Sequence, residues 1–384
     1  MATENGDRSI RRVDLRARVL VRSILAASVA FPCAAGTVRH TQVAESQLVS
    51  LTLPGGKLQA HVSPTRGAEL VGLEVRRNRQ WSELLYRGMD FRPTDGWSGR
   101  APILWPAVGR NYSNPSAPDA RDDALTWTHN GKTYPIAIHG FARDLPWQLV
   151  SQGVCDQSAF VQLALRDNAT SRRSYPFGFE LETEYRLWKS SLYIRQSVRS
   201  DPSNKEPMPF SIGNHITLAI PLVPGSAPGA TTIATPATEQ VITDSTGRPT
   251  GQVVAVNYSQ PRRLDSLQPL TPISLSGYPE GPAWVRVTDP TGFALTIAHT
   301  EERRPNGVPV LFNLWGDPAR GYFAPEPWVG KQNSLASGDG IISLSPSETF
   351  RWTLTVTLSN DNGASNGANT QASLSSAQEL PTCH

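Results

Sequence analysis

The chain has 384 residues and a mass of 41.8 kDa, and it holds 32 Pro, 30 Gly and three Cys. This length allows a large core, while the many turn-forming residues argue against a helical bundle and the few cysteines against a cysteine-rich metal scaffold. Residues 1–36 carry six of the 36 basic and three of the 33 acidic residues, so the remainder has no net charge. A body without net charge does not attract phosphate backbones at long range, so we expect no nucleic-acid partner.

Residues 1–36 have the order of a secretory leader. An Arg-rich stretch precedes a mostly apolar run from Ile24 to Phe31, and small residues follow as far as Gly36. This order predicts cleavage near Ala35 and a secreted or periplasmic protein; a disordered extension is the alternative. The apolar run is too short for a permanent membrane helix and no later run is long enough, so we expect no integral membrane segment.

Alternation of apolar and polar residues with a period of two predicts strands through residues 37–360. From Phe179 to Leu187 the odd positions are mostly apolar, while the even positions hold three glutamates and an arginine. That pattern is typical of a half-buried strand in an antiparallel sheet. The same period predicts further strands at residues 160–165, 192–198, 284–287 and 352–358.

Turn markers such as Asn130-Gly131 fall between these runs, and no strong helical pattern interrupts them. Closely spaced turns of this kind are typical of all-β folds rich in hairpins. We therefore predict one large antiparallel β-sandwich over residues 37–360, with two domains as the alternative. The stretch from Pro221 to Pro236, rich in Pro, Gly, Ala and Thr, is predicted to be a long surface loop.

Residues 361–384 are rich in Asn, Ser, Ala and Gln and have little to bury, which predicts a mobile low-complexity tail. Cys155 and Cys383 remain if the leader is removed. An oxidising compartment would allow them to pair, but Cys383 lies one residue from the end of the tail. The sequence therefore leaves open both a bridge and two free thiols.

Three residues in unusual settings are candidates for catalysis. His139 precedes a Gly-Phe-Ala-Arg run, His215 follows Asn214, and Glu326 stands between two prolines and near Trp328. A carboxylate fixed between prolines and beside an aromatic ring is expected to be partly desolvated, which raises its pKa toward that of a general base. Each residue also has a plainer interpretation, because a histidine among apolar residues is more often a core residue and a Glu beside Pro more often a loop residue.

No metal site is predicted. His139 and His215 lie far apart in the sequence, and neither has a zinc-type partner two or four positions away. The chain also lacks the nucleophile elbow of serine hydrolases, the glycine-rich dinucleotide loop and the phosphate-binding P-loop.

Five motifs occur along the chain in the order of one known family. They are Pro102-Ile-Leu-Trp-Pro-Ala-Val-Gly-Arg110, His139-Gly-Phe-Ala-Arg143 with Trp147, Tyr175-Pro-Phe-Gly-Phe179, Asn214-His215, and Glu326-Pro-Trp-Val-Gly330. Together they resemble the aldose 1-epimerase (galactose mutarotase-like) family over residues 47–358. The resemblance implies a β-supersandwich whose concave face binds a pyranose, with neither a metal nor an organic cofactor.

The resemblance also implies a role for each matched residue. Glu326 matches the general base that takes the proton of the anomeric hydroxyl, and His215 matches the general acid that protonates the ring oxygen. His139 matches a histidine that hydrogen-bonds near the ring oxygen, and Arg110 an arginine that contacts sugar hydroxyls. The further candidates for contact with the sugar are Asn214, Asp317, Trp315 and Trp328.

Departures from the family pattern leave the substrate open. The residues after His215 lack the aromatic-rich run of galactose mutarotases, and the His-Gly-Phe-Ala-Arg form resembles the branch that includes glucose-6-phosphate 1-epimerases. Arg143 is then a candidate phosphate ligand, because a guanidinium binds phosphate through two parallel hydrogen bonds. An ion pair with Asp144 or a surface position is the alternative.

The leader favours a free sugar, because a secreted enzyme rarely meets a phosphorylated one. We therefore expect a cofactor-independent isomerase that interconverts the anomers of a free hexose, as a monomer or homodimer. The alternatives are a hexose-6-phosphate 1-epimerase and a non-catalytic carbohydrate-binding protein of the same fold.

Overall fold

The computed structural model describes residues 36–53, 55–92, 97–112, 125–155, 157–245 and 247–360. All of them belong to one compact unit. The predicted leader, apart from Gly36, and the predicted tail lie outside the described residues. In the ranges that are described, no helix is both long enough and apolar enough to cross a membrane.

The fold is built from antiparallel sheets, which confirms the predicted all-β class. A five-stranded sheet has the order β1-β2-β3-β4-β5 and consists of β1 (Thr37–Val43), β2 (Ser46–Thr52), β3 (Leu58–Ser63), β4 (Glu69–Arg77) and β5 (Gln80–Glu83). A nine-stranded sheet has the order β19-β16-β21-β22-β26-β12-β11-β10-β9 and consists of β9 (Gln148–Cys155), β10 (Ser158–Arg166), β11 (Phe179–Trp188), β12 (Ser191–Ser200), β16 (Thr232–Ala234), β19 (Arg262–Arg263), β21 (Ala283–Thr288), β22 (Phe293–Glu301) and β26 (Thr349–Asn360).

An eight-stranded sheet has the order β18-β17-β20-β23-β24-β14-β6, with β15 also paired to β24. It consists of β6 (Ile103–Leu104), β14 (Ile212–Asn214), β15 (Leu218–Ala219), β17 (Glu239–Thr243), β18 (Pro249–Ala255), β20 (Ile273–Ser276), β23 (Val310–Asp317) and β24 (Tyr322–Val329). Smaller pairs join β7 (Thr126–His129) to β8 (Lys132–Pro135) and β13 (Met208–Phe210) to β25 (Ile342–Leu344). Helical structure in the described ranges is confined to the single turns α1 (Ser171–Ser174) and α2 (Ser334–Ser337) and to short 3-10 turns.

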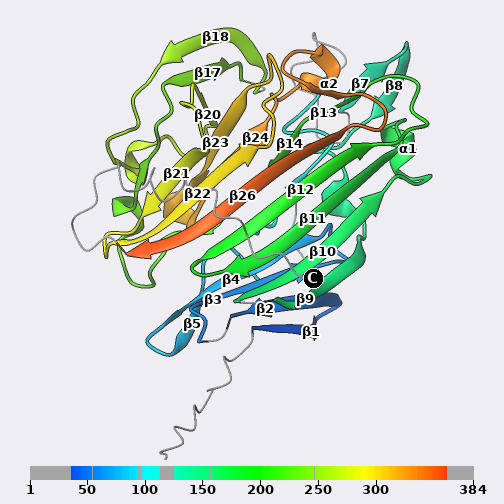
Figure 1. Ribbon diagram of the computed structural model, residues 1–384. Coiled ribbons are helices and arrows are strands. Elements are labelled where there is room, and N and C mark those ends of the chain that lie inside the picture. The colour runs from blue at the N-terminus through cyan, green and yellow to red at the C-terminus, as the bar shows by residue number, and fades with distance from the viewer. Residues whose placement is uncertain are drawn as a thin grey trace, which may run out of the picture. The chain divides into compact units, whose positions relative to one another are not determined.

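The sheets pack as a sandwich in which the nine-stranded sheet is the shared layer. Its strands β21 and β22 pack on β23 and β24 of the eight-stranded sheet, while β10 and β11 pack on the five-stranded sheet. Figure 1 shows the long strands β26, β12 and β11 side by side across this layer. Both other sheets therefore bury their inner faces against one continuous surface.

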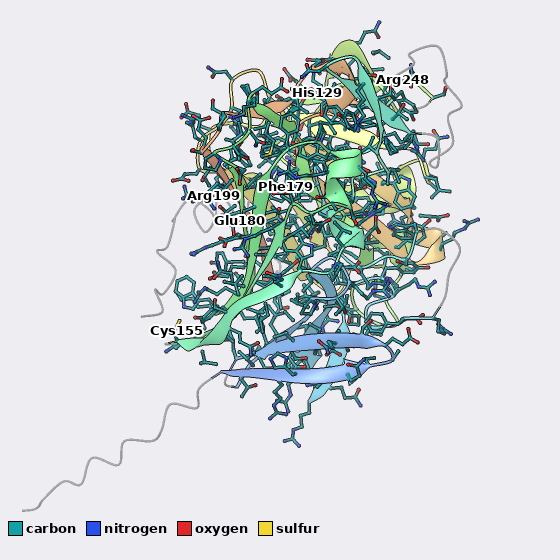
Figure 2. All side chains as sticks on the ribbon, turned by 90° about the vertical axis from the view of Figure 1, so that its right-hand side faces the viewer. His129, Cys155, Phe179, Glu180, Arg199 and Arg248 are labelled. Atoms are coloured by element: carbon teal, nitrogen blue, oxygen red, sulfur yellow. The ribbon has the colours of Figure 1, made fainter. Side chains whose placement is uncertain are left out.

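Strand β11 illustrates how the sequence period produces the core. Leu181 and Tyr185 are fully buried, and the Tyr185 hydroxyl donates to the carbonyl oxygen of Ala68 over 2.7 Å. On the opposite face, Glu180 forms an ion pair with Arg199 of β12 at 2.8 Å, and Figure 2 shows the two residues next to each other. The predicted half-buried strand is confirmed, and the other predicted strands lie within β10, β12, β21 and β26.

The stretch from Pro221 to Pro236 is not all loop, because Thr232–Ala234 forms β16 between β19 and β21. A three-residue strand is too short to show a period, although its central Ile233 is fully buried.

Cys155 is disulfide-bonded; the other cysteines, Cys33 and Cys383, both lie outside the described residues.

Candidate active site

A cleft of about 1290 Å³ opens over one face of the eight-stranded sheet. Its floor includes a row of four side chains, namely Val241 on β17, Ser274 on β20, Asn313 on β23 and Glu326 on β24. Residues in register on adjacent strands point to the same face, so strand pairing alone brings these four residues to one surface.

The three predicted catalytic residues meet in this cleft. Nitrogen or oxygen atoms of His139, His215 and Glu326 lie within 4.8 Å of one another, and His215 Nε2 is 3.4 Å from Glu326 Oε1. The His215 side chain is 7% exposed and that of Glu326 is 2% exposed, so water screens their interaction little. The structure therefore places a buried imidazole and a buried carboxylate side by side at the wall of a cavity.

Glu326 lies in the middle of a strand and not in a loop. On one side of β24, β23 pairs along its whole length, but on the other side β15 pairs only with its first two residues and β14 only with its last two. Pro325 and Pro327 fall opposite this gap, where a residue that cannot donate a ladder hydrogen bond is tolerated. His215 belongs to the segment that joins β14 to β15 across the gap, which carries it to Glu326.

Two donors hold the Glu326 carboxylate in place. Asn313 Nδ2 donates to Oε1 over 3.4 Å, and Trp328 Nε1 donates to Oε2 over 3.2 Å. Ser274 Oγ donates to Asn313 Oδ1 over 2.9 Å, which turns the amide nitrogen toward the carboxylate. Burial raises the pKa of Glu326 well above its ordinary value, and the two hydrogen bonds oppose this rise.

A local hydrogen-bond pattern fixes the tautomer of His215. Thr217 Oγ1 donates to the His215 carbonyl oxygen over 3.0 Å and lies 3.2 Å from His215 Nδ1. Because the hydroxyl proton is already used, the Thr217 oxygen accepts from Nδ1–H, and Nε2 faces Glu326. Burial lowers the pKa of His215 to about 4, with a backbone hydrogen bond opposing and the Arg143 guanidinium adding to the shift. The pair therefore shares one proton near neutral pH.

His139 is held as a neutral hydrogen-bond donor. Its backbone is left-handed (φ 65°), and the next residue must be Gly140 because a Cβ there would lie 2.2 Å from the Trp105 carbonyl oxygen. The Gly109 N–H donates to His139 Nδ1 over 3.0 Å, so Nδ1 is an acceptor and Nε2 carries the hydrogen. Burial lowers the pKa of His139 well below its ordinary value, and the charges of His215, Arg143 and Arg110 add to this.

The same three residues have the types of a metal site. The sequence argument against a metal rested on spacing, and the folded chain removes that argument because it brings the residues together. The donor chemistry still disfavours a cation. Metal ligation needs a lone pair on each imidazole, whereas His139 uses the Nδ1 lone pair to accept from Gly109 and keeps a hydrogen on Nε2.

Four of the predicted sugar ligands line the cleft, namely Arg110, Arg143, Trp315 and Trp328. Trp328 also holds Glu326, as described above. Arg143 Nε is buried without a hydrogen-bond partner among the described residues, and it lies 3.8 Å from the Asp144 carboxylate. The Arg143 guanidinium therefore has capacity for a ligand, and its contact with a sugar stays a prediction.

Asn214 and Asp317 are placed differently. Asn214 is fully buried, and its Nδ2 donates to the Ala101 carbonyl oxygen over 3.1 Å. Asp317 accepts hydrogen bonds from the N–H groups of Ala319 and Arg320 and so caps a 3-10 turn. Neither is among the described residues that line the cleft, and the contact of each with a sugar stays a prediction.

Three residues of the site were not predicted from the sequence. The Trp97 ring lies 5.9 Å from that of His215 and 5.1 Å from that of Trp315, between centroids. Asn313 and Ser274 position Glu326, yet neither belongs to a recognisable motif. Only the register of β20, β23 and β24 reveals their role.

Residues 48–278, more than half of the chain, match the family described as aldose 1-epimerase. A search of curated proteins gave no match. Several solved structures are similar. A galactose mutarotase-like protein from Clostridium acetobutylicum is 18% identical with a TM-score of 0.68, over 85% of this chain and 99% of that one. A protein of Synechocystis sp. PCC 6803 is 24% identical with a TM-score of 0.62, over 85% and 96%.

A galactose 1-epimerase from Lactobacillus acidophilus NCFM is 16% identical with a TM-score of 0.60, over 85% of this chain and 98% of that one. These likenesses confirm the galactose mutarotase-like fold. The family match confirms the resemblance and the isomerase class, but not the glucose-6-phosphate branch. The chain belongs to the aldose 1-epimerase family.

Proposed function

We propose that the protein is a cofactor-independent mutarotase that interconverts the α and β anomers of a free hexose. The observation that carries this proposal is the buried pair of His215 and Glu326, 3.4 Å apart at the wall of the cleft. Mutarotation removes a proton from one sugar oxygen and delivers a proton to its neighbour. It therefore requires an acid beside a base and no nucleophile.

In the reactive form of the pair, the shared proton lies on His215 Nε2 and Glu326 is ionised. Glu326 then accepts the proton of the anomeric hydroxyl, and the C1–O1 bond becomes a carbonyl. The C1–O5 bond breaks, and O5 takes a proton from His215 Nε2. Rotation about C1–C2 presents the other face of the carbonyl to O5. Closure returns both protons with the roles exchanged, so the pair holds one proton before and after the cycle.

His139 supports the same step without changing its own charge. Its neutral imidazole offers Nε2–H to the oxygen that gains electron density as the ring opens. The rings of Trp97, Trp315 and Trp328 line the same cleft and provide apolar faces for the C–H groups of a pyranose.

The predicted leader, residues 1–36, supports a free hexose and a secreted or periplasmic location. One observation favours a second candidate, a hexose 6-phosphate. The buried Arg143 Nε has no hydrogen-bond partner among the described residues and only an ion pair with Asp144 at 3.8 Å. A guanidinium of this kind suits a phosphate. A non-catalytic binding protein is a weaker candidate, since sugar binding alone does not require a buried acid beside a base.

The test is to follow the optical rotation of freshly dissolved α-D-glucose and α-D-galactose with the purified protein and with the Glu326→Gln variant. We expect the wild type to speed the approach to equilibrium and the variant to lose this effect. If neither sugar responds, the same measurement with glucose 6-phosphate and with Arg143→Ala examines the second candidate. No acceleration of any of these sugars would contradict both.

A further inference from the structure

Glu83, the last residue of β5, binds backbone groups through a half-buried carboxylate. Its Oε1 accepts from the N–H groups of Leu73, Leu84 and Leu85 over 2.9, 3.0 and 2.8 Å. Glu74 stands directly opposite on β4, and two like charges in this position destabilise a sheet. The three hydrogen bonds offset that cost, and they fix the residues that follow β5 to β4.

The residues that follow Glu83 pair with the end of the segment that joins β14 to β15, which carries the histidine of the cleft. The Tyr86 N–H donates to the Thr217 carbonyl oxygen over 2.9 Å. An antiparallel bridge joins Leu85 to Leu218 of β15, so the two segments run side by side like strands. Because the Leu85 N–H is bound to Glu83 Oε1, the place of this pairing depends on the carboxylate.

Thr217 connects this backbone pairing to the chemistry of the cleft. Its N–H donates to the Arg100 carbonyl oxygen over 2.8 Å, and its carbonyl oxygen accepts from Tyr86, so backbone bonds hold it on both sides. Its hydroxyl oxygen lies 3.2 Å from His215 Nδ1 and accepts the hydrogen on that nitrogen, as described above. A charged donor makes the stronger hydrogen bond, so this contact stabilises a protonated His215 more than a neutral one.

The Glu83 carboxylate itself has little freedom to move. A Cβ at Gly88 would lie 2.5 Å from Glu83 Oε2, so the loop after Tyr86 passes directly over the acid. A Cβ at Gly72 of β4 would lie 3.2 Å from the same oxygen. Backbone therefore encloses Oε2 on two sides while three N–H groups bind Oε1, which makes the acid a rigid connection between β4 and the segment of Thr217.

We propose that Glu83 is a positioning residue for His215. It fixes the backbone that follows β5, this backbone fixes Thr217, and Thr217 keeps the ring hydrogen on His215 Nδ1. Glu83 is not among the described residues that line the cleft, so it acts on the substrate only through His215. The effect on turnover rests on the proposed function, whereas the effect on the His215 ring does not.

NMR of the histidine rings, labelled with nitrogen-15, tests the effect on His215 without any need for turnover. The His215 signals are identified by their absence from His215→Ala. In Glu83→Ala we expect the ratio of rings with hydrogen on Nε2 to rings with hydrogen on Nδ1 to rise about tenfold, since about 1.4 kcal/mol of lost preference gives that factor. Glu83→Gln keeps an oxygen that accepts the same hydrogen bonds, so its spectrum should match that of the wild type.

Two further variants sharpen the NMR test. Glu83→Asp retains the charge but moves the oxygens back by about 1.5 Å, so it should change the His215 ring in the same direction even if Glu83→Ala does not fold. Glu74→Ala is the matched control, because Glu74 lies opposite Glu83 in the sheet but binds the His61 ring instead of the chain after β5. It should leave the His215 ring unchanged.

Polarimetry on the same variants measures the consequence for the reaction. Glu83→Ala should lower kcat about tenfold and leave KM for the sugar within about twofold. A protonated His215 without its hydrogen bond to Thr217 gives up its proton more easily, so the alkaline limb of the pH profile should move to lower pH. A loss of folded protein alone would lower the rate without moving the limb. Thr217→Val should cause the same changes, and adding Glu83→Ala to it should change nothing further.

An unchanged His215 ring in folded Glu83→Ala and Glu83→Asp would overturn this inference, as would an equal change of the ring in Glu74→Ala. Additive losses of kcat in the double variant of Glu83→Ala and Thr217→Val would overturn it as well. A ring that responds to Glu83→Ala in a protein that does not speed mutarotation would contradict only the proposed function. Rapid mutarotation by a wild type whose ring does not respond to Glu83→Ala would contradict only this inference.

Discussion

Two of the three His–Glu pairs among the described residues have different surroundings. On the five-stranded sheet, His61 Nε2 lies 2.9 Å from Glu74 Oε2, and His61 Nδ1 lies 2.8 Å from Ser50 Oγ. Both ring nitrogens therefore have partners within the protein. In the cleft, His215 Nε2 lies 3.4 Å from the Glu326 carboxylate, and this contact faces a cavity.

This difference is the basis for proposing a structural role for the first pair and a catalytic role for the second. The network of Ser50, His61 and Glu74 spans three adjacent strands, β2, β3 and β4, and fixes their faces to one another. None of its members is among the described residues that line the cleft. A histidine beside a glutamate is thus informative only when its contact is long enough, and open enough, for a substrate oxygen to take part.

The largest expected effect comes from removing either member of the pair in the cleft. Glu326→Gln and His215→Ala should each lower kcat for mutarotation about a hundredfold or more, the scale of a lost acid or base. Glu74→Gln, the matched change in the other pair, should leave kcat within about twofold. The measurement is polarimetry, corrected for the spontaneous rate in the same buffer. Full activity in both cleft variants would refute the mechanism.

The pH dependence of kcat should distinguish the shared proton from an ordinary histidine. The pair is active with one proton, so activity falls when it gains a second or loses the first. Burial lowers the pKa of His215 to about 4 and raises that of Glu326. We expect activity to persist at pH 5, to fall about tenfold per unit below pH 4, and to decline at high pH only as the pair loses its one proton. An acid limb near pH 6.5, the ordinary histidine value, would contradict this assignment.

The strands could be predicted from the sequence where their period was long enough to count. β11 and β26 are ten and twelve residues long and alternate over most of that length, and both were predicted. β6 and β15 have two residues each, and β14 and β16 have three, so no period exists to detect. Of these short strands, β14 and β15 pair with the two ends of β24 and bring His215 to Glu326.

The residues of the site also differ in whether the sequence could reveal them. His139, His215 and Glu326 stand in motifs, and the resemblance identified them. Asn313 and Ser274 act only through register with Glu326, which a single sequence does not encode in any local pattern. The hydrogen bond from Asn214 to the Ala101 carbonyl oxygen likewise joins residues that become neighbours only in the folded chain.

A smaller effect on kcat should follow when Glu326 is retained but its carboxylate is held less firmly. Ser274→Ala removes the hydroxyl that orients the Asn313 amide, at a cost of about 1 kcal/mol or a several-fold fall in kcat. The Asn313 hydrogen bond opposes the effect of burial on Glu326, so weakening it should raise the Glu326 pKa further. The alkaline limb of the pH profile should then move to higher pH. Ser274→Thr keeps a hydroxyl, so it should restore both kcat and the position of the alkaline limb. If Ser274→Ala does not move the alkaline limb, the Asn313 amide does not depend on Ser274 for its orientation.

The smallest effect on activity is expected at the structural pair, where the change appears in stability instead. His61→Ala leaves Ser50 and Glu74 without their shared partner and should lower the free energy of unfolding by about 1–3 kcal/mol. Urea denaturation measures this loss, and polarimetry on the same sample should give kcat within about twofold of wild type. A large fall in kcat of His61→Ala at unchanged stability would mean that this part of the five-stranded sheet affects catalysis in the cleft. In that case the contrast between the two His–Glu pairs would not hold, because exposure to a cavity would not be what makes such a pair reactive.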